Sequence, residues 1–514
     1  MIRRVERGVH RLLAVVLLSA VVAAPAAAAE GFTTRFVTVP AADGVGLGAM
    51  VLEPRAPGPH PVAVLISAWG GGATQNVIPA KNLADRGYAV VAYGARGFGE
   101  SGGQVEVAGA ADIADVSTVI DWALANTDAD PMRIGVGGVS YGAGIGLIAA
   151  GADARIKAVA SLSGWADLAE SLSQNETRHG LAGLVLYLSG KANGELSAET
   201  DTMLTKFLAP HLSDADSAAI IEWSKPRSPS THLDRINAHR PAVLTIQTWS
   251  ETVFPPDQMV ELYQKLTGAK RAEFRPGDHA SAESGGLLGL PSETWNSVYR
   301  WFDAHVAGTD DSITRENPIV TRARPGAQAP ETFPDWASAV GSPSRWELAP
   351  AELTTGRDTP ANGGVPLATY SLEALTGNPP TAFLPLVSKR DAAIWQQEPL
   401  ATPMRIRGAL TARLTATPST RNGTVIAYVY DVDQFGVGRL INYLPYSWKN
   451  TEPGSPLRMD LAFSPTAYTV PAGHCLALVA DTKDPLFLDW TTEEGRLAFS
   501  APSWLDIPTK GSQG

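Results

Sequence analysis

The chain contains one cysteine, Cys475, among 514 residues. A single thiol cannot form a disulfide within the chain, and it argues against a metal site built on cysteine ligands. Basic residues are outnumbered too, because 41 lysines and arginines face 52 aspartates and glutamates, which gives a net charge of −11. Since no stretch gathers lysine and arginine into a patch, the sequence argues against nucleic acid or an anionic membrane surface as a partner.

Beyond its first residues the sequence lacks any apolar run long enough to span a bilayer. At the start, an apolar run over residues 12–24 and small residues at 27–29 follow a basic stretch that holds Arg3, Arg4, Arg7 and Arg11. This order is typical of a secretory signal peptide, so we predict one over residues 1–29, cleaved after Ala29. The secreted chain that remains loses four arginines and one glutamate, and its net charge becomes −14.

The most informative stretch that is present reads Gly-Val-Ser-Tyr-Gly over residues 138–142. It lies between a short apolar run of strand character, 134–139, and a segment of small apolar residues typical of a buried helix. A G-x-S-x-G pattern at a strand-to-helix junction predicts a nucleophile elbow, in which Ser140 is exposed above the sheet. Positions 138 and 142 would have to be glycine, because a side chain there would clash with the neighbouring strand and helix. The alternative is a turn of small residues that lets a helix pack closely on a sheet.

The first three hundred residues alternate between buried strands and helices. A continuous apolar run, which is typical of a parallel strand covered on both faces, occurs at 62–66, and further strands of buried character are expected at 89–93, 134–139, 158–162 and 243–247. Helical patterns separate them, so we predict a doubly wound α/β-hydrolase fold over residues 30–310. Between about 164 and 240 helical patterns follow one another without a convincing strand, which predicts a helical cap inserted above the sheet.

The remaining residues change character. Residues 311–345 are rich in proline, alanine and arginine, and we interpret them as a linker that partly lies on the surface. Over residues 346–514, short alternating strands separated by turn residues recur at 404–416, 425–432, 457–463, 476–479 and 496–499. This spacing predicts an all-β domain, a β-sandwich or jelly roll.

A serine nucleophile needs a base within hydrogen-bond reach and an acid that orients the base. In α/β-hydrolases these follow in the order serine, acid, histidine. His279 is the best candidate for the base, because it lies in a loop directly after a strand and before the last helix. The other histidines after Ser140 lie in the cap, in an amphipathic helix or in the β region: His179, His211, His232, His239, His305 and His474.

Glu251 is the favoured acid because it directly follows the strand 243–247. Asp257, a few residues later and behind two prolines, is the alternative, and Asp278 is too close to His279 in sequence to reach its ring easily. For the oxyanion we expect the backbone N–H of Tyr141 and a donor near Trp69, either its backbone amide or its indole N–H. The alternative for Trp69 is a packing residue under the cap.

Several motifs together resemble the cocaine-esterase and X-prolyl dipeptidyl peptidase group of serine hydrolases. They are GGVSYGA around Ser140, ARGFGESGG at 95–103, TWSETVFPP at 248–256 and PGDHA at 276–280, with PMRIRG at 403–408 and VIAYVYDV at 425–432 in the β region. The resemblance implies Ser140 as nucleophile, Glu251 as acid, His279 as base and a C-terminal jelly roll that helps to wall the site. Acyl transfer by these three residues is expected to need no metal and no organic cofactor. Arg96 in the second motif is interpreted as a structural residue that ties glycine-rich loops together.

Two positions depart from this group's pattern. The group usually has aspartate where Glu251 stands, and esterase members often place a tyrosine hydroxyl in the oxyanion hole where Trp69 stands. Tryptophan has a different reach, so the acyl preference is expected to differ.

The sequence therefore predicts a secreted serine hydrolase that acts on a small-molecule ester or a short peptide. The first alternative is an X-prolyl dipeptidyl aminopeptidase. That activity needs carboxylates for the free α-amino group, and the cap supplies Asp167, Glu170, Glu176, Glu195, Glu199 and Asp201 as candidates. The second alternative is an inactive glycan-binding protein, suggested by the glutamate at position 251.

Overall fold

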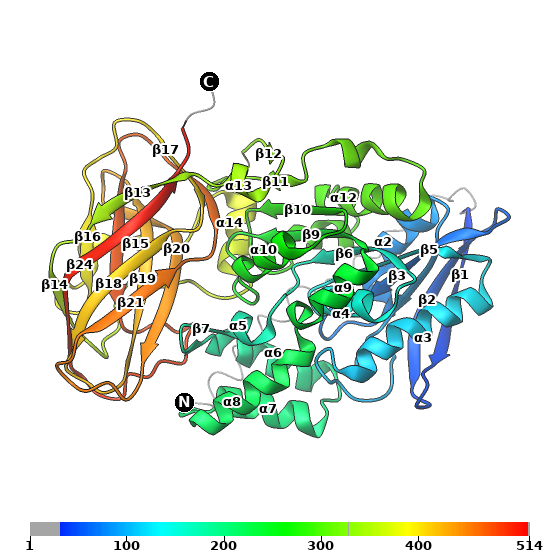
Figure 1. The fold of residues 1–514 in the computed structure, drawn as a ribbon, viewed down its shortest axis with the longest axis horizontal. Coiled ribbons are helices and arrows are strands. Elements are labelled where there is room, and N and C mark those ends of the chain that lie inside the picture. Colours follow the sequence, from blue (N-terminus) through cyan, green and yellow to red (C-terminus); the bar gives the residue numbers. More distant parts are fainter. Residues whose placement is uncertain (1–30, 327, 512–514) are drawn as a thin grey trace, which may run out of the picture.

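The computed structural model describes residues 31–326 and 328–511. They form an α/β domain and an all-β domain that lie side by side (Figure 1). The predicted signal peptide over residues 1–29 lies outside the described residues. Within the described part of the chain, no helix is long and apolar enough to cross a membrane.

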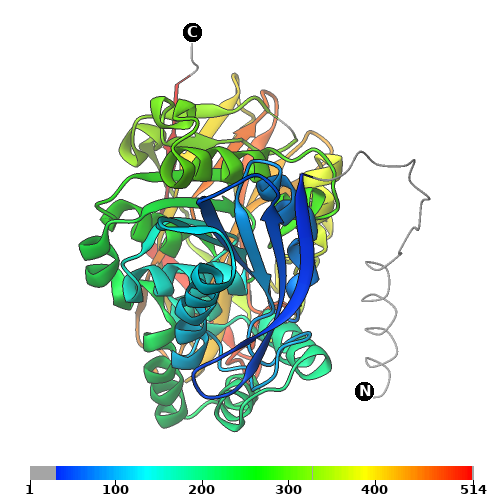
Figure 2. The same cartoon turned by 90° about the vertical axis from the view of Figure 1, so that its right-hand side faces the viewer.

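The α/β domain is built on one ten-stranded sheet in the order β1-β2-β4-β3-β5-β6-β9-β10-β11-β12. The strands from β4 through β11 in this order run parallel, while β1, β2 and β12 pair antiparallel. The β1–β2 edge faces the viewer in Figure 2. The strands are β1 (Phe32–Pro40), β2 (Gly46–Pro54), β3 (His60–Ile66), β4 (Ala89–Tyr93), β5 (Ala129–Val139), β6 (Ile156–Leu162), β9 (Ala242–Thr248), β10 (Lys270–Arg275), β11 (Ile319–Thr321) and β12 (Glu331–Phe333).

Helices cover both faces of this sheet, which is why its central strands are mostly apolar. One core cluster joins the strands to α3 (Ala110–Asn126), α4 (Tyr141–Ala152), α9 (Leu233–His239) and α10 (Pro256–Lys265). A second joins the opposite face to α2 (Val77–Ala84) and α12 (Glu293–Phe302). The predicted α/β-hydrolase fold is confirmed.

The cap lies between β6 and β9, as predicted. Besides α9, its helices are α5 (Leu168–Leu172), α6 (Gly180–Asn193), α7 (Ala198–Leu208) and α8 (Asp214–Ser224). The structure adds a hairpin that the sequence did not reveal, β7 (Ser173–Gln174) with β8 (Thr177–Arg178). Two-residue strands are too short to show the alternation by which strands are identified in a sequence.

The cap hairpin is hydrogen-bonded to the all-β domain. The Ser447 N–H donates to the Asn175 carbonyl at 2.9 Å, and the Asn175 amide donates to the Pro445 carbonyl at 3.1 Å. The hydroxyls of Thr177 and Ser447 are 2.7 Å apart. The cap is therefore attached to the all-β domain at this end as well as to the sheet below it.

Two antiparallel sheets pack on each other in the all-β domain, so the predicted β-sandwich is confirmed. One sheet has the order β21-β18-β24-β17-β22, with β13 and β14 also paired to β24, and the other has the order β15-β20-β19-β23-β16. The strands are β13 (Ser342–Glu347), β14 (Ala351–Thr354), β15 (Thr381–Phe383), β16 (Ala393–Gln396), β17 (Met404–Gly408), β18 (Thr411–Pro418), β19 (Gly423–Val432), β20 (Val437–Trp448), β21 (Leu457–Ala462), β22 (Thr466–Val470), β23 (Cys475–Asp481) and β24 (Arg496–Thr509).

The segment 311–345, expected to be a linker, is part of the fold instead. It supplies β11, which pairs parallel with β10, and β12 at the edge of the large sheet. Each of these strands has three residues, so neither produced a recognisable pattern. From the same segment the fully buried Arg324 donates two hydrogen bonds to Glu373 of α14 (Thr369–Thr376), at 2.6 and 2.7 Å. This ion pair ties the segment to the part of the chain that leads into the sandwich.

Candidate active site

Ser140 lies at a sharp turn between β5 and α4, with backbone angles φ 56° and ψ −108°. This left-handed conformation is rare for a residue with a side chain and is typical of a nucleophile elbow. A Cβ on Gly138 would lie 2.7 Å from the backbone of Gly142, and one on Gly142 would lie 2.5 Å from the Ile66 carbonyl oxygen. Only glycine fits at these two positions, so the turn fixes where the Ser140 hydroxyl stands.

His279 and Glu251 reach Ser140 from the ends of neighbouring strands. The Nε2 atom of His279 is 2.7 Å from the Ser140 Oγ, and its Nδ1 atom is 2.8 Å from Glu251 Oε1. A carboxylate can only accept, so Nδ1 carries the proton and Nε2 is free to accept from the serine hydroxyl. Since β5, β9 and β10 are parallel, the three residues that follow them meet at one edge of the sheet.

Backbone donors hold the Glu251 carboxylate in place. Its Oε1 atom also accepts from the N–H groups of Val253 and Phe254, at 3.1 and 3.2 Å. The alternative acid, Asp257, is not brought to His279, because its carboxylate contacts Gln174 and Ser464 at 3.4 and 3.5 Å. The side chain of Glu251 is fully buried, so its charge is little screened by solvent.

The environment of His279 favours its protonated form. Burial alone lowers the pKa of His279, but the charge and hydrogen bond of Glu251 outweigh burial and raise this pKa above its ordinary value of 6.5. Asp278 and Glu283 add smaller effects in the same direction. An imidazole whose conjugate acid is stabilised in this way is a stronger base toward the serine hydroxyl.

Two residues that the sequence did not single out hold the segment after His279. The Ser163 hydroxyl donates to Glu283 at 2.9 Å and accepts from the Ala280 N–H at 3.2 Å. Both Ser163 and Ala280 have positive φ angles, 47° and 57°. Glu283 is in α11 (Ser281–Leu287), and burial raises its pKa to about 7. Nothing in the sequence distinguishes Glu283 from a solvated glutamate on a helix surface.

The backbone N–H groups expected at the oxyanion hole belong to Tyr141 and Trp69. In the described part of the chain, neither Tyr141 nor Trp69 donates its backbone N–H to a protein acceptor, and Tyr141 is the first residue of α4. The indole of Trp69, the other expected donor, is instead bonded to the Leu186 carbonyl in the cap at 3.0 Å. The Tyr141 hydroxyl donates to the buried Asp112 at 2.9 Å, which keeps the ring in the core.

A small apolar pocket of about 40 Å³ lies directly beside Ser140. Since a water molecule needs a cavity of at least about 10–15 Å³, the pocket has room for an acyl group of a few carbons. No charged side chain is among its lining residues, which are Trp69, Val107, Ser140, Tyr141, Trp165, Leu168, Leu172, Leu186, Leu204, Trp223 and Phe254. The pocket therefore suits an uncharged apolar group next to the serine.

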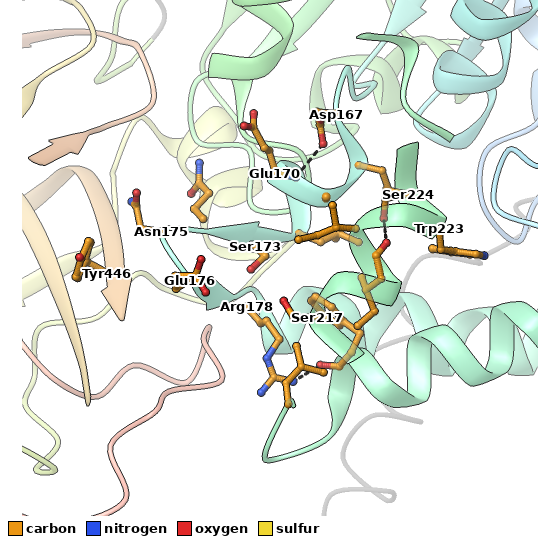
Figure 3. A pocket seen from close by; sticks show the side chains of 18 of the residues that line it. Asp167, Glu170, Ser173, Asn175, Glu176, Arg178, Ser217, Trp223, Ser224 and Tyr446 are labelled. Carbon is orange, nitrogen blue, oxygen red and sulfur yellow. Dashed lines mark hydrogen bonds between the residues drawn. The ribbon is translucent and has the colours of Figure 1, made fainter. Parts of the chain in front are cut away.

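The acidic residues of the cap lie elsewhere. Asp167, Glu170 and Glu176 line a separate cavity of about 660 Å³ between the cap and the sandwich (Figure 3). The remaining three point to other surroundings: Glu195 is exposed, Glu199 pairs with Arg227 and Asp201 pairs with Lys191. Arg96, interpreted as structural, is buried and joins Asp115 of α3 to Asp43 between β1 and β2.

The arrangement suits acyl transfer. It offers a hydroxyl bonded to an imidazole, a buried carboxylate on the other side of the ring, two free backbone donors and an apolar recess. Over residues 31–326 and 328–511, no three histidine, cysteine, aspartate or glutamate side chains gather as a set of metal ligands.

Comparison with protein-family models gives two matches. Residues 43–281 match the model of the X-Pro dipeptidyl-peptidase (S15 family). Residues 312–504 match the model of the X-Pro dipeptidyl-peptidase C-terminal non-catalytic domain. The two matches follow the division into an α/β domain and a sandwich.

Among solved structures, an aminopeptidase from a marine sediment archaeon, Thaumarchaeota archaeon, has a TM-score of 0.74 at 15% identity, covering 96% of this chain and 99% of that one. An alpha-amino acid ester hydrolase has a TM-score of 0.70 at 15% identity, with the same coverage. A CocE/NonD family hydrolase from Staphylococcus aureus has a TM-score of 0.67 at 13% identity, covering 93% of this chain and 94% of that one. At these identities the likeness shows the fold shared by both domains.

Proposed function

Because the chain belongs to the cocaine-esterase and X-prolyl dipeptidyl-peptidase group of serine hydrolases, which cleave acyl esters or amides, we propose that Ser140, His279 and Glu251 form its catalytic triad. The observation that carries the proposal is the unbroken line of hydrogen bonds from Ser140 Oγ through the His279 ring to Glu251. The inactive glycan-binding alternative is disfavoured, since a protein without catalytic activity does not need a buried carboxylate hydrogen-bonded through His279 to Ser140.

The reaction follows from the geometry. His279 takes the hydroxyl proton as Ser140 attacks the acyl carbonyl, and Glu251 stabilises the imidazolium that forms. The N–H groups of Tyr141 and Trp69 donate to the oxyanion, aided by the N-terminal end of α4. The imidazolium then protonates the leaving group. Water, deprotonated by His279, attacks the acyl-enzyme and releases the acid.

The pocket beside Ser140 favours an ester or amide with a short, uncharged acyl group. An X-prolyl dipeptidyl aminopeptidase would instead bring a protonated α-amino group close to the serine, and such a cation needs an anionic partner when it is taken out of water. No carboxylate lines this pocket. The peptidase stays the second candidate because the matching family model and the archaeal aminopeptidase carry that activity in their names.

A pair of peptide substrates separates the two candidates. We expect the enzyme to hydrolyse p-nitrophenyl butyrate. We expect the kcat/KM values for Gly-Pro-p-nitroanilide and for its N-acetyl derivative to agree within about threefold, because no carboxylate in the pocket would pair with the free amine. Initial rates measured by absorbance give this ratio. A preference of a hundredfold or more for the free amine would establish the aminopeptidase instead.

We also propose that the protein is secreted. The support is the order of basic, apolar and small residues over positions 1–29. When the full chain, including residues 1–29, is expressed in a bacterium, the protein is expected outside the cytoplasm with Glu30 as its first residue. N-terminal sequencing checks this, and a cytoplasmic chain that still starts at Met1 would contradict it.

A further inference from the structure

Two cavities of very different size share a wall in the cap. The small pocket beside Ser140 measures about 40 Å³, and the large cavity between the cap and the sandwich measures about 660 Å³. Four side chains line both: Leu168, Leu172, Leu204 and Trp223. A side chain that lines two cavities stands between them, so these four residues form a partition.

The cap side of the large cavity continues the apolar character of the small pocket. Beyond the partition, α7 and α8 contribute Met203, Phe207, Ile220 and Ile221. Figure 3 shows Trp223 and Ser217 on the cap side of this cavity and Tyr446 on the sandwich side. An acyl chain that passed the partition would therefore meet these apolar side chains, although Asp167, Glu170 and Glu176 line the same cavity.

The partition is held by fixed contacts. At the start of α5, the Gln258 side chain accepts from the N–H groups of Ala166 and Asp167, and the Leu168 N–H donates to the Ser228 hydroxyl at 2.9 Å. Beyond the end of α5, the hairpin is bonded to β20 through Asn175. Because α5 is fixed at both ends, its leucines do not give way easily to a longer substrate.

We propose that Leu172 sets the upper length of the acyl chain by closing the small pocket against the large cavity. Leu172 is the last residue of α5 and is only half-buried, so its side chain borders open space more than it packs in the core. Leu168, Leu204 and Trp223 are all buried and also support the cap. The inference rests on the proposed function, since it names the acyl groups that Ser140 accepts.

Shortening Leu172 would join the two cavities. Each methylene group that moves from water into an apolar site is worth about fourfold in kcat/KM. An octanoyl chain has four more methylene groups than a butyryl chain. Burying even half of them would raise the octanoate-to-butyrate ratio of kcat/KM about fifteenfold.

The test is a p-nitrophenyl ester series from acetate to decanoate. The wild type is expected to prefer acetate or butyrate, and Leu172→Ala is expected to raise the octanoate-to-butyrate ratio of kcat/KM at least tenfold. Leu186→Ala is the matched control, because Leu186 lines the small pocket and not the large cavity. Leu172→Phe keeps the partition closed and is expected to retain the wild-type profile.

Different results overturn different claims. Suppose that the wild type hydrolyses short esters while Leu172→Ala shows the same chain-length profile as the wild type or as Leu186→Ala. That result would overturn the proposal that the partition sets the chain length. If Leu172→Ala fails to fold by circular dichroism, Leu168→Ala takes its place with the same expectation. If esters are not turned over, the release of one p-nitrophenolate per enzyme from heptyl- and propylphosphonate esters, whose chains match octanoyl and butyryl groups, reports the same preference at Ser140. A folded wild type that reacts with neither would overturn the proposed function and the inference with it.

Discussion

Replacing Ser140 by alanine is expected to lower kcat for p-nitrophenyl butyrate by about 10⁵- to 10⁶-fold, because the covalent route is lost altogether. The backbone donors and the apolar pocket remain, so some acceleration over the uncatalysed reaction should persist. Rates measured with a large excess of enzyme quantify this remainder.

Labelling with a fluorophosphonate gives an independent readout of the same residue. The wild type is expected to be labelled and Ser140→Ala to be unlabelled, while Ser344→Ala, a change on the exposed face of β13, should label as the wild type does. Labelling that persists without Ser140 would place the nucleophile elsewhere. A well-folded wild type that takes no label would favour the glycan-binding alternative.

The second large effect is expected at the acid. Glu251→Gln should lower kcat by about 10⁴-fold at pH 7, since an amide facing Nδ1 holds the imidazole in the wrong tautomer. Asp257→Asn is the matched control and should leave kcat within about threefold, because Asp257 contacts Gln174 and Ser464 rather than His279. If Asp257→Asn lost as much activity as Glu251→Gln, Asp257 would be the acid.

The pH profile adds a readout that misfolding cannot imitate. Only neutral His279 can take the proton from Ser140, so activity falls as the pH drops through the pKa of His279. Glu251 raises that pKa, which places the acid limb above the ordinary histidine value of 6.5. In Glu251→Gln this charge is gone, and the acid limb of the residual activity should move to lower pH. A limb that stays in place would show that Glu251 does not act through His279.

The sequence is most informative where strands are long and buried. The apolar runs over 134–139 and 243–247 end just ahead of Ser140 and Glu251, which is enough to predict that both residues lie at one edge of a parallel sheet. These strands can be identified in the sequence because a strand covered on both faces is apolar at most positions. The same reasoning predicts the cap, whose helices lack strands between them for most of its length.

What escapes prediction depends on partners distant in the chain. The strands β7, β8, β11 and β12 have two or three residues each and exist because a neighbour pairs with them. The hydrogen bond from the Trp69 indole N–H to the Leu186 carbonyl depends on how the cap packs over the sheet. Ser163 and Glu283 meet across 120 positions of sequence, and neither belongs to a recognisable motif.

The hydrogen bonds between the cap hairpin and β20 bear on how such proteins diversify. The α/β domain and the sandwich match separate family models, as if they were interchangeable modules. Yet Asn175 and Thr177 are paired with the sandwich only a few positions beyond Leu172, which borders the pocket beside Ser140. Replacing the sandwich alone by that of another protein would place the cap hairpin against a strand other than β20 and would disturb the pocket beside Ser140. The position of the cap beside Ser140 thus depends on contacts from both domains, so a substitution in β20 can alter the pocket without touching the α/β domain.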